Sequence, residues 1–476
     1  MSKIYLTTTL PYVNADPHIG FALEIIQADV VARFYRSLGD EVFFNFGTDE
    51  HGQKIYEKAL EAGQDPQVYT DEYAKKFDKL KTILNLTYNN FVRTTDKHHV
   101  MAAQEFWKKC VVAGDIYKKN YKIKYCVGCE LEKTDSELIN CRCPIHPNKD
   151  LEEREEENYF FRFSNYQQKL LDLYDKRSDL VVPESRFHEI KKFVECGLED
   201  FSISRLAKKM PWGVPVPGDS EQVMYVWFDA LVNYISAISW PDDMAKFNSW
   251  WPVIQFAGKD NLRQQSAMWQ AMLMSAGIAS SKQILIHGFI TAGGGVKMSK
   301  SLGNVINPFD MVQKYGTDAL RYFLLREVNP FEDSPFTEER FKESYNSGLA
   351  NGLGNLTSRL LKMSESYAVL SPDFRNMELS GEWDKLNSFV RHYEFKAAMD
   401  LIWDKIASID SEIQREKPFI VFKTDPEIAR EIVGRLLTEL SEIAKALALF
   451  MPETSEKILS AIKVNKMPKP LFPRLE

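Results

Sequence analysis

Long apolar runs and a signal sequence are both missing from this chain. No stretch approaches the roughly 18 consecutive apolar residues that a membrane-spanning helix needs. The N-terminus, MSKIYLTTTLPY, fits a strand followed by a proline turn rather than a secretory leader. We therefore expect no membrane association and a cytoplasmic location.

The sequence also has little excess charge of either sign. Its 476 residues include 60 Lys and Arg against 67 Asp and Glu, for a net charge of −7. A protein that coats nucleic acid is usually strongly basic, so the net charge argues against that class. Binding of a single RNA through local basic patches stays open, because a partner feels the local field rather than the sum.

Cysteine is scarce, and its spacing argues against a disulfide framework. Four of the six cysteines cluster in a CxxC pair and a CxCPxH segment. Zinc knuckles separate paired ligands by two residues, which selects Cys126 with Cys129 and Cys143 with His146. Cys141 is a fifth candidate, but it lies too close to Cys143 for the same turn and is left out. Four protein ligands leave no open position, so we expect one structural Zn²⁺ on which this segment depends for folding.

The chain is long enough for several cores, roughly two to four domains. A hydrophobic content of 44% and a charged content of 27% are ordinary for a globular protein. Residues 65–114 are expected to form helices, and the acidic run at 150–157 a solvated face. Residues 347–476 carry apolar side chains at helical spacing, as at Leu353 and Leu356, which predicts a helix bundle.

The N-terminal pattern predicts a nucleotide-binding unit. Residues 4–9 are β-rich, and residues 21–36 carry apolar side chains at helical spacing. A strand, a tight turn and a helix form the first half of a Rossmann-like unit, which binds nucleotide where the strand ends. His18 lies at the turn, where the N–H groups of the helix favour phosphate. Asp49 follows a second strand at 42–46, where it faces the same crevice or, alternatively, caps the next helix.

A glycine- and lysine-rich loop, AGGGVKMSKSLGN, occupies residues 292–304 after an apparent buried strand. Lys297 and Lys300 are three residues apart, and Ser299 and Ser301 add hydroxyls. Lysine binds phosphate as a point charge, so the loop suits a polyphosphate that gains charge as it reacts. The alternative is a solvated turn.

These motifs together resemble the class I aminoacyl-tRNA synthetases. KMSKS is the second signature of that family, and Pro17-His18-Ile19-Gly20 matches the first, except that Phe21 stands where the family has His. The wider resemblance is to the methionyl-tRNA synthetase family, in its form with a single zinc knuckle, and covers nearly the whole chain.

The resemblance implies an α/β fold with a Rossmann-like parallel-sheet catalytic domain, an inserted zinc-binding connective domain and a C-terminal α-helical bundle that reads the anticodon. The implied boundaries are 1–117 and 225–290 for the two catalytic halves, 118–224 for the connective domain, 291–346 for the KMSKS loop and connecting helices, and 347–476 for the anticodon-binding domain.

The implied activity is that of a methionine–tRNA ligase, which activates L-methionine with ATP and Mg²⁺ and transfers it to the terminal adenosine of tRNA(Met). A monomer is expected, without the appended dimerisation domain of some relatives. The residues implied for catalysis are His18, Lys297, Lys300 and Arg205, and those implied for ATP binding are His18, Gly20, Lys297, Ser299 and Lys300.

The resemblance also implies two recognition sites. Asp49 would hold the ammonium of methionine, and Trp227 and Tyr234 would wall the pocket, since a thioether packs well on aromatic rings. Asn261 and Gln265 depart from the Ile and His of the family. The full implied methionine set is Thr9, Leu10, Tyr12, Asp49, Trp227, Ala230, Leu231, Tyr234, Asn261 and Gln265, and the anticodon set is Asn355, Arg359, Pro418 and Phe419.

Two other functions remain open. A class I synthetase for another aliphatic amino acid would share both signatures, but residues 118–225 leave little room for the editing insertion of those enzymes. A non-catalytic tRNA-binding relative is suggested by Phe21, Asn261 and Gln265, and opposed by the intact lysine loop. Pyrophosphate exchange across amino acids distinguishes the three.

Overall fold

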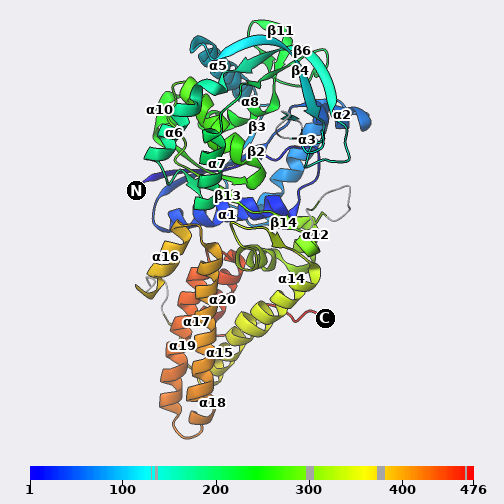
Figure 1. Cartoon of the computed structure of the whole chain (residues 1–476). Helices are drawn as coiled ribbons and strands as arrows, with labels where there is room; N and C mark the ends of the chain where they lie inside the picture. Colours follow the sequence, from blue (N-terminus) through cyan, green and yellow to red (C-terminus); the bar gives the residue numbers. More distant parts are fainter. Residues whose placement is uncertain (130, 134–137, 296–297, 299–304, 373–380, 467–468) are drawn as a thin grey trace.

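The computed structural model describes residues 1–129, 131–133, 138–295, 298, 305–372, 381–466 and 469–476. The chain forms an α/β body at one end and a long helix bundle at the other (Figure 1). No helix in the described residues is long and apolar enough to cross a membrane.

A parallel six-stranded sheet forms the centre of the α/β body, with strand order β3-β2-β1-β12-β13-β7. Chain order reverses at β1, which pairs with β2 on one side and with β12 on the other. Ligands bind beyond the carboxyl ends of strands at such a switch point. The strands are β1 Lys3–Thr8, β2 Glu41–Thr48, β3 Asn90–Arg93, β7 Val181–Val182, β12 Val253–Gly258 and β13 Gln283–His287.

Helices pack against this sheet. The first, α1 Ile19–Ser37, is buried on most of its surface, from Ile19 through Phe34, and packs against β1, β2 and β12. A helix buried all round is typical of the interior of a large protein. The others are α2 Gln53–Glu61, α3 Pro66–Asp78, α4 Leu80–Ile83, α5 Lys97–Val112, α8 Val226–Leu231, α9 Asn233–Ser236, α10 Met244–Trp250 and α11 Trp269–Ser275.

An antiparallel domain is inserted between the halves of the sheet. Its long hairpin pairs β4 Ile116–Cys126 with β6 Glu152–Phe161, so the acidic run is mostly strand. Glu152, Glu153 and Glu157 of the run are exposed, in agreement with the expected solvated face. Lys118 of β4 forms an ion pair with Glu157 of β6, with its Nζ 3.6 Å from the carboxylate, and a second with Asp219 outside the hairpin at 2.7 Å. The remaining elements are β5 Leu131–Glu132, β8 Phe201–Ser202, β9 Ser204–Leu206, β10 Pro215–Val216, β11 Asp219–Met224, α6 Gln167–Lys176 and α7 Glu184–Glu195.

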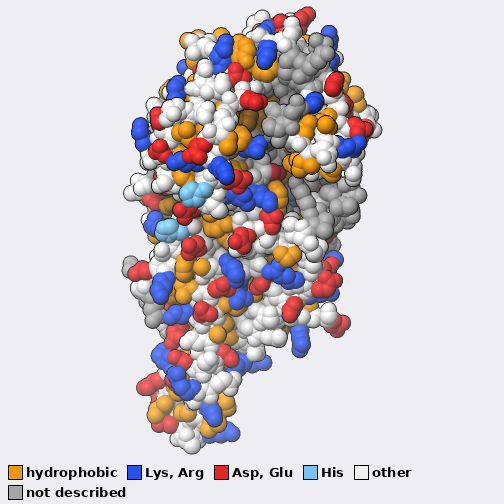
Figure 2. Space-filling view, viewed as in Figure 1, with side chains coloured by type: hydrophobic (Ala, Val, Ile, Leu, Met, Phe, Trp, Pro, Cys, Tyr) orange, Lys and Arg blue, Asp and Glu red, His pale blue; other side chains and the backbone are white. Residues whose placement is uncertain are grey.

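The bundle is built around two 22-residue helices, α17 Phe395–Glu416 and α19 Pro426–Leu447. Figure 2 shows acidic and basic side chains interspersed over the visible face of the bundle, without one dominant basic patch. The other helices of this half are α12 Pro308–Tyr315, α13 Thr317–Tyr322, α14 Glu338–Ser344, α15 Asn355–Ser366, α16 Asp384–Arg391, α18 Pro418–Val421 and α20 Pro452–Val464, and a two-residue pair joins β14 Ile290–Thr291 to β15 Ser334–Pro335.

A buried ion pair connects the bundle to the sheet. Arg321 of α13 lies 2.9 Å from Asp29 of α1 and donates to the carbonyl of Phe450 at 2.6 Å. Burial raises the pKa of Asp29, but the guanidiniums of Arg321 and Arg33 outweigh it, so the pKa lies below its usual value. The α/β class, the Rossmann-like parallel sheet and the C-terminal helices are thus confirmed, while the domain boundaries stay predictions.

Candidate active site

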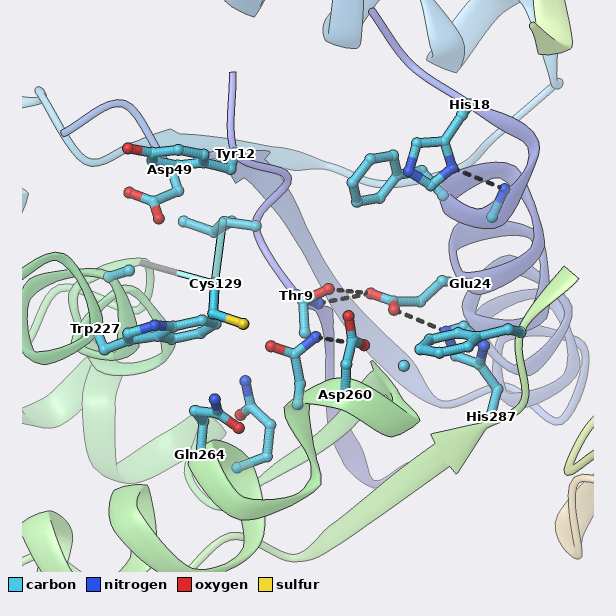
Figure 3. Close-up of a pocket in the computed structure, with 18 of the residues that line it drawn as sticks. Thr9, Tyr12, His18, Glu24, Asp49, Cys129, Trp227, Asp260, Gln264 and His287 are labelled. Atoms are coloured by element: carbon cyan, nitrogen blue, oxygen red, sulfur yellow. Dashed lines mark hydrogen bonds and ion pairs between the residues drawn. The ribbon is translucent and has the colours of Figure 1, made fainter. Parts of the chain in front are cut away.

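A cavity of about 510 Å³ opens at the carboxyl ends of the central strands, beside the switch point. His18, Glu24 and His287 lie on one side of it, and Asp49, Tyr12 and Trp227 on the other (Figure 3). All residues implied for methionine line this one cavity, namely Thr9, Leu10, Tyr12, Asp49, Trp227, Ala230, Leu231, Tyr234, Asn261 and Gln265. Residues far apart in the sequence therefore meet in one place.

The orientation of His18 is set by the first turn of α1. His18 is the N-cap, and its Nδ1 accepts a hydrogen bond from the backbone N–H of Gly20 at 3.1 Å. A Cβ at position 20 would lie 2.9 Å from this ring, so a glycine is needed there. Because Nδ1 is used as an acceptor, Nε2 carries the proton of the neutral ring. The side chain thus offers a donor at a helix N-terminus, which suits phosphate oxygens.

Sequence reasoning missed a buried carboxylate, Glu24, that lines the same cavity as His18. Glu24 Oε1 accepts from the backbone N–H and the hydroxyl of Thr9, at 2.8 and 2.6 Å. Its Oε2 lies 2.9 Å from Nε2 of His287. His287 Nδ1 lies 2.7 Å from the carbonyl of Gly288, so both ring nitrogens face acceptors. Burial lowers the pKa of His287, but the Glu24 carboxylate outweighs it, and the pKa is raised.

Asp49 is held at the other side of the cavity by the loop after β1. Its backbone N–H donates to the carbonyl of Pro11 at 3.0 Å, and its carbonyl accepts from Val13 at 3.1 Å. A Cβ at Gly52 would lie 2.6 Å from the hydroxyl of Tyr12, and Gly52 has a φ of +111°. Only glycine readily adopts that conformation so close to a ring. The GTDEHG turn therefore brings a buried carboxylate beside an aromatic wall, which suits an ammonium group.

A second buried network of polar contacts is centred on Asp229, which lies on α8 with Trp227. Asp229 lies 2.6 Å from Nδ1 of His51 and 2.9 Å from Nε2 of His99. Burial raises the pKa of Asp229, but the two histidines lower it to about 2. This carboxylate ties α8 to α5 and to the turn that contains Asp49, and it is another group that sequence reasoning missed.

Two of the four residues that could hold a metal, Cys129 and His146, line the same cavity. The ligand atoms of Cys126, Cys129, Cys143 and His146 all lie within 4.8 Å of one another. A Cβ at Gly128 would lie 2.3 Å from the ring of His146, so the turn between the first two cysteines needs glycine. Three thiolates and one imidazole are a donor set typical of structural zinc.

The knuckle formed by these four residues also contacts the catalytic body. Gly128, Cys129, Ile145 and His146 line the cavity, and Lys54 donates to the carbonyl of Gly128 at 3.0 Å. Cys141 is exposed and is not a member of the ligand cluster. The metal-binding segment is therefore placed to shape the cavity as well as to fold itself.

Some expected site residues lie elsewhere. Lys297, Ser299 and Lys300 lie outside the described residues, although Met298 between them lines the cavity. Arg205 is buried and does not line the cavity. Its Nη1 lies 2.7 Å from both the Ser202 hydroxyl and the Ser204 carbonyl, and its guanidinium lies over the ring of Tyr225. Arg205 is therefore an interior side chain rather than a surface one.

The residues expected to contact the anticodon lie on the bundle. Asn355 and Arg359 are on α15, where Asn355 is exposed and Arg359 forms an ion pair with Asp410. Pro418 and Phe419 begin α18, at the tip of the bundle farthest from the sheet (Figure 1). Phe419 is 45% exposed, which leaves its ring accessible for stacking.

Comparison with known proteins gives consistent results. A model of the family "tRNA synthetases class I (M)" matches residues 4–147 and 129–361. A methionine–tRNA ligase of Thermotoga maritima is 41% identical, covering 98% of this chain and 76% of that protein, and one of Nostoc sp. is 40% identical, covering 94% and 87%. The solved structure of Mycobacterium tuberculosis methionyl-tRNA synthetase in complex with methionyl-adenylate has a TM-score of 0.90 at 34% identity, covering 100% of this chain and 98% of that one.

Proposed function

The chain belongs to the methionine–tRNA ligases of the class I tRNA synthetase family, and we propose that the cavity beside the switch point is where it activates methionine with ATP. It is an ATP-dependent ligase that forms methionyl-adenylate and then charges tRNA. The observation that carries the assignment of the site is the convergence of His18, Asp49 and Trp227 on one cavity.

The ATP triphosphate is proposed to occupy the side of the cavity at the N-terminus of α1. One oxygen of the methionine carboxylate attacks the α-phosphorus, and pyrophosphate leaves as the bridging P–O bond breaks. The Nε2 proton of His18 and the first N–H groups of α1 stabilise the charge that spreads over the phosphate oxygens. Lys297 and Lys300 are proposed to supply mobile positive charge, with Ser299 as a hydroxyl donor. Mg²⁺ bound with ATP neutralises the phosphates.

The amino acid is proposed to occupy the opposite side. Asp49 pairs with the ammonium group, and a charge-assisted bond of this kind is stronger than a neutral one. Trp227, Ala230, Leu231 and Tyr234 surround the side chain, with Leu10 and Tyr12 facing them. The protein forms no covalent bond to the substrate, so its contribution is positioning and electrostatic stabilisation.

The four-residue knuckle is proposed to bind one structural zinc ion. Its three sulfurs and one ring nitrogen fit the metal, and they leave no open coordination position. The ion would hold the turns at Gly128 and Ile145 against the cavity. The role expected for Arg205 in activation stays a prediction, because this side chain would have to leave its contacts with Ser202 and Tyr225 to reach the substrates.

Transfer to tRNA is proposed to use the bundle. A hydroxyl of the terminal adenosine attacks the acyl carbon of methionyl-adenylate, and AMP leaves. At the other end of the molecule, Phe419 stacks on an anticodon base while Asn355 and Arg359 contact the same loop of tRNA(Met). The expected monomeric state and cytoplasmic location stay predictions.

Methionine-dependent exchange of pyrophosphate into ATP tests this function. We expect exchange with methionine, none with valine, isoleucine or leucine above background, and transfer of labelled methionine to tRNA(Met). A chain that binds tRNA but exchanges nothing would be a non-catalytic relative. Exchange with another aliphatic amino acid in preference to methionine would indicate a different synthetase.

A further inference from the structure

Four buried polar side chains form a connected row next to the methionine side of the cavity. They are His51 in the turn after β2, Asp229 of α8, His99 of α5 and Ser236 of α9, and each is at most 6% exposed. None of these four described residues is among those that line the cavity. The proposed activation step gives them no role. We call them the Asp229 network.

The contacts of the Asp229 network have one consistent arrangement of protons. Asp229 Oδ2 lies 2.6 Å from Nδ1 of His51, and Oδ1 lies 2.9 Å from Nε2 of His99. Despite its burial, the carboxyl of Asp229 has a pKa of about 2, because both imidazoles contact it. An ionised carboxylate can only accept, so both histidines donate to it. In the neutral ring of His99, Nδ1 then accepts from the hydroxyl of Ser236, 2.9 Å away.

Three elements of the methionine side each carry one cavity residue and, two positions later, one residue of the Asp229 network. The pairs are Asp49 with His51, Trp227 with Asp229, and Tyr234 with Ser236. Residues two positions apart on a helix point about 200° apart. On α8 and α9, one member of each pair therefore faces the cavity and the other faces away from it, toward α5, which packs against both helices.

The network joins parts of the chain that are far apart in the sequence. Asp229 and His51 are separated by 178 residues, yet their contact links α8 to the turn that carries Asp49. His99 then links the same carboxylate to α9 through Ser236. Hydrogen bonds to an ionised group are shorter and stronger than neutral ones, so these links fix the spacing of the three elements.

The ATP side of the cavity has a separate support. His18 is held by the first turn of α1, and Glu24 of α1 pairs with His287 of β13. The contacts of the Asp229 network run instead to α5, α8, α9 and the turn after β2. Loss of the network is therefore expected to disturb one substrate site and to leave the other in place.

We propose that the four residues of the Asp229 network are positioning residues for methionine. The network holds the Asp49 turn, α8 and α9 at the spacing that the ammonium group and the side chain of one amino acid require. This inference rests on the proposed methionine site. Binding groups held in the right geometry before the substrate arrives need no rearrangement when it binds, and a small misplacement weakens their contacts with it. The network acts on the substrate only through the residues that it holds.

The test measures KM for methionine and KM for ATP separately in pyrophosphate exchange. The concentration of active sites is counted from the methionyl-adenylate formed in a single turnover. Asp229→Asn keeps the shape of the side chain, but its amide has one acceptor oxygen for two donating imidazoles. His51→Ala removes the link to the Asp49 turn, whereas His51→Asn keeps an N–H donor near the position of Nδ1.

Asp115→Asn is the matched control. Asp115 is also a buried carboxylate with two side-chain donors, since it accepts from the hydroxyls of Tyr166 and Ser275 at 2.5 and 2.7 Å. These three described residues are not among those that line the cavity. The control therefore reports what loss of a buried acceptor does to the fold alone.

We expect Asp229→Asn and His51→Ala to raise the KM for methionine roughly tenfold or more, as for loss of a hydrogen bond to a charged group. The KM for ATP should stay within about twofold of the parent value. His51→Asn should recover most of the loss seen in His51→Ala. Asp115→Asn should leave both KM values unchanged, even where its unfolding midpoint falls.

A merely structural role would reduce the number of active sites and leave the KM for methionine unchanged, and this result would overturn the proposal. Equal rises in both KM values would overturn it as well. If Asp229→Asn does not fold, Ser236→Ala decides the case, because it removes only the link to α9 and should still raise the KM for methionine alone. A parent chain without methionine-dependent exchange would contradict the proposed function instead.

Discussion

The ring of Phe21 lies against the imidazole of His18, with centroids 4.2 Å apart and planes inclined by 33°. On its other side, Phe21 meets the edge of Phe77 at 5.8 Å. The residue that departs from the family signature thus forms an apolar support for the imidazole of His18. Compared with the His of the family signature, Phe21 has no ring nitrogen to offer a ligand.

Restoring the family residue should strengthen ATP binding. Phe21→His adds a ring donor beside His18, and we expect the KM for ATP in pyrophosphate exchange to fall roughly three- to tenfold, the equivalent of one hydrogen bond. Phe21→Leu is the control, because it keeps an apolar support without a donor. An unchanged KM for ATP in Phe21→His would mean that the position matters less than the family signature implies.

His18 should matter for the transition state rather than for the fold. We expect His18→Ala to lower kcat by roughly 100- to 1,000-fold, as for loss of one donor to a developing negative charge. Its thermal unfolding midpoint should change much less than kcat, because the cap bond to Gly20 and the contact with Phe21 are local to the start of α1. His188→Ala, on the exposed face of α7, is the control and should be as active as the parent. A loss below tenfold would remove His18 from the proposed mechanism.

The pair of His287 and Glu24 should make stability depend on pH. The pKa of His287 is raised in the folded protein by the Glu24 carboxylate, against an ordinary value of about 6.5. The stabilisation is therefore complete below about pH 6.5, and it is lost as pH rises through the folded pKa. Replacing His287 by Gln removes this contribution.

Thermal unfolding across that range checks the sign. We expect the free energy of unfolding of the parent protein to exceed that of His287→Gln by about 1–3 kcal/mol at about pH 6. This difference should narrow toward pH 9. His392→Gln, which alters an exposed histidine of the bundle, is the control, and its difference from the parent in free energy of unfolding should not vary with pH. A gap that widens with increasing pH would contradict an imidazolium in this pair.

Removal of the metal should affect both folding and methionine binding. We expect about one zinc per chain by elemental analysis, and its loss in Cys129→Ser together with a lower unfolding midpoint. Because the knuckle lines the cavity, the KM for methionine should also rise. Cys141→Ser should keep the zinc, since Cys141 is exposed outside the ligand cluster, and Cys196→Ser is a distant exposed control. Retention of zinc by Cys129→Ser, or its loss from Cys141→Ser, would show that the ligand set is wrong.

Local spacing in the sequence predicts two parts of the site without reference to any family. The strand and turn before α1 place His18, and the two-residue gaps pair Cys126 with Cys129 and Cys143 with His146, whose ligand atoms all lie within 4.8 Å of one another. These patterns act within one turn or hairpin, so they need no knowledge of the rest of the chain.

The groups that sequence reasoning missed depend on distant partners. Glu24 is one turn along α1 from Gly20, and nothing in its neighbours distinguishes it from a surface acid. Its partner, His287, is 263 residues away, and the two meet only because β1 and β13 flank β12 in one sheet. Strand β3 was missed for a similar reason, because four residues between helices become a strand only by pairing with β2. One signal was available in the sequence. The apolar residues on all sides of α1 indicate a buried helix, and a polar residue such as Glu24 on a buried helix needs a partner.

Phe419 offers the sharpest test of the proposed contact with tRNA. Its ring is 45% exposed at the tip of the bundle, where no substrate of the activation step can reach. Stacking of a base on an aromatic ring contributes about 1–3 kcal/mol, so Phe419→Ala should raise the KM for tRNA(Met) roughly 5- to 150-fold. Pyrophosphate exchange, which needs no tRNA, should be unchanged. Ile420→Ala is the matched control, because Ile420 is 50% exposed on the same short helix and has no ring. Equal effects of the two substitutions on aminoacylation would indicate a general loss of apolar surface, and the stacking role of Phe419 would then be wrong.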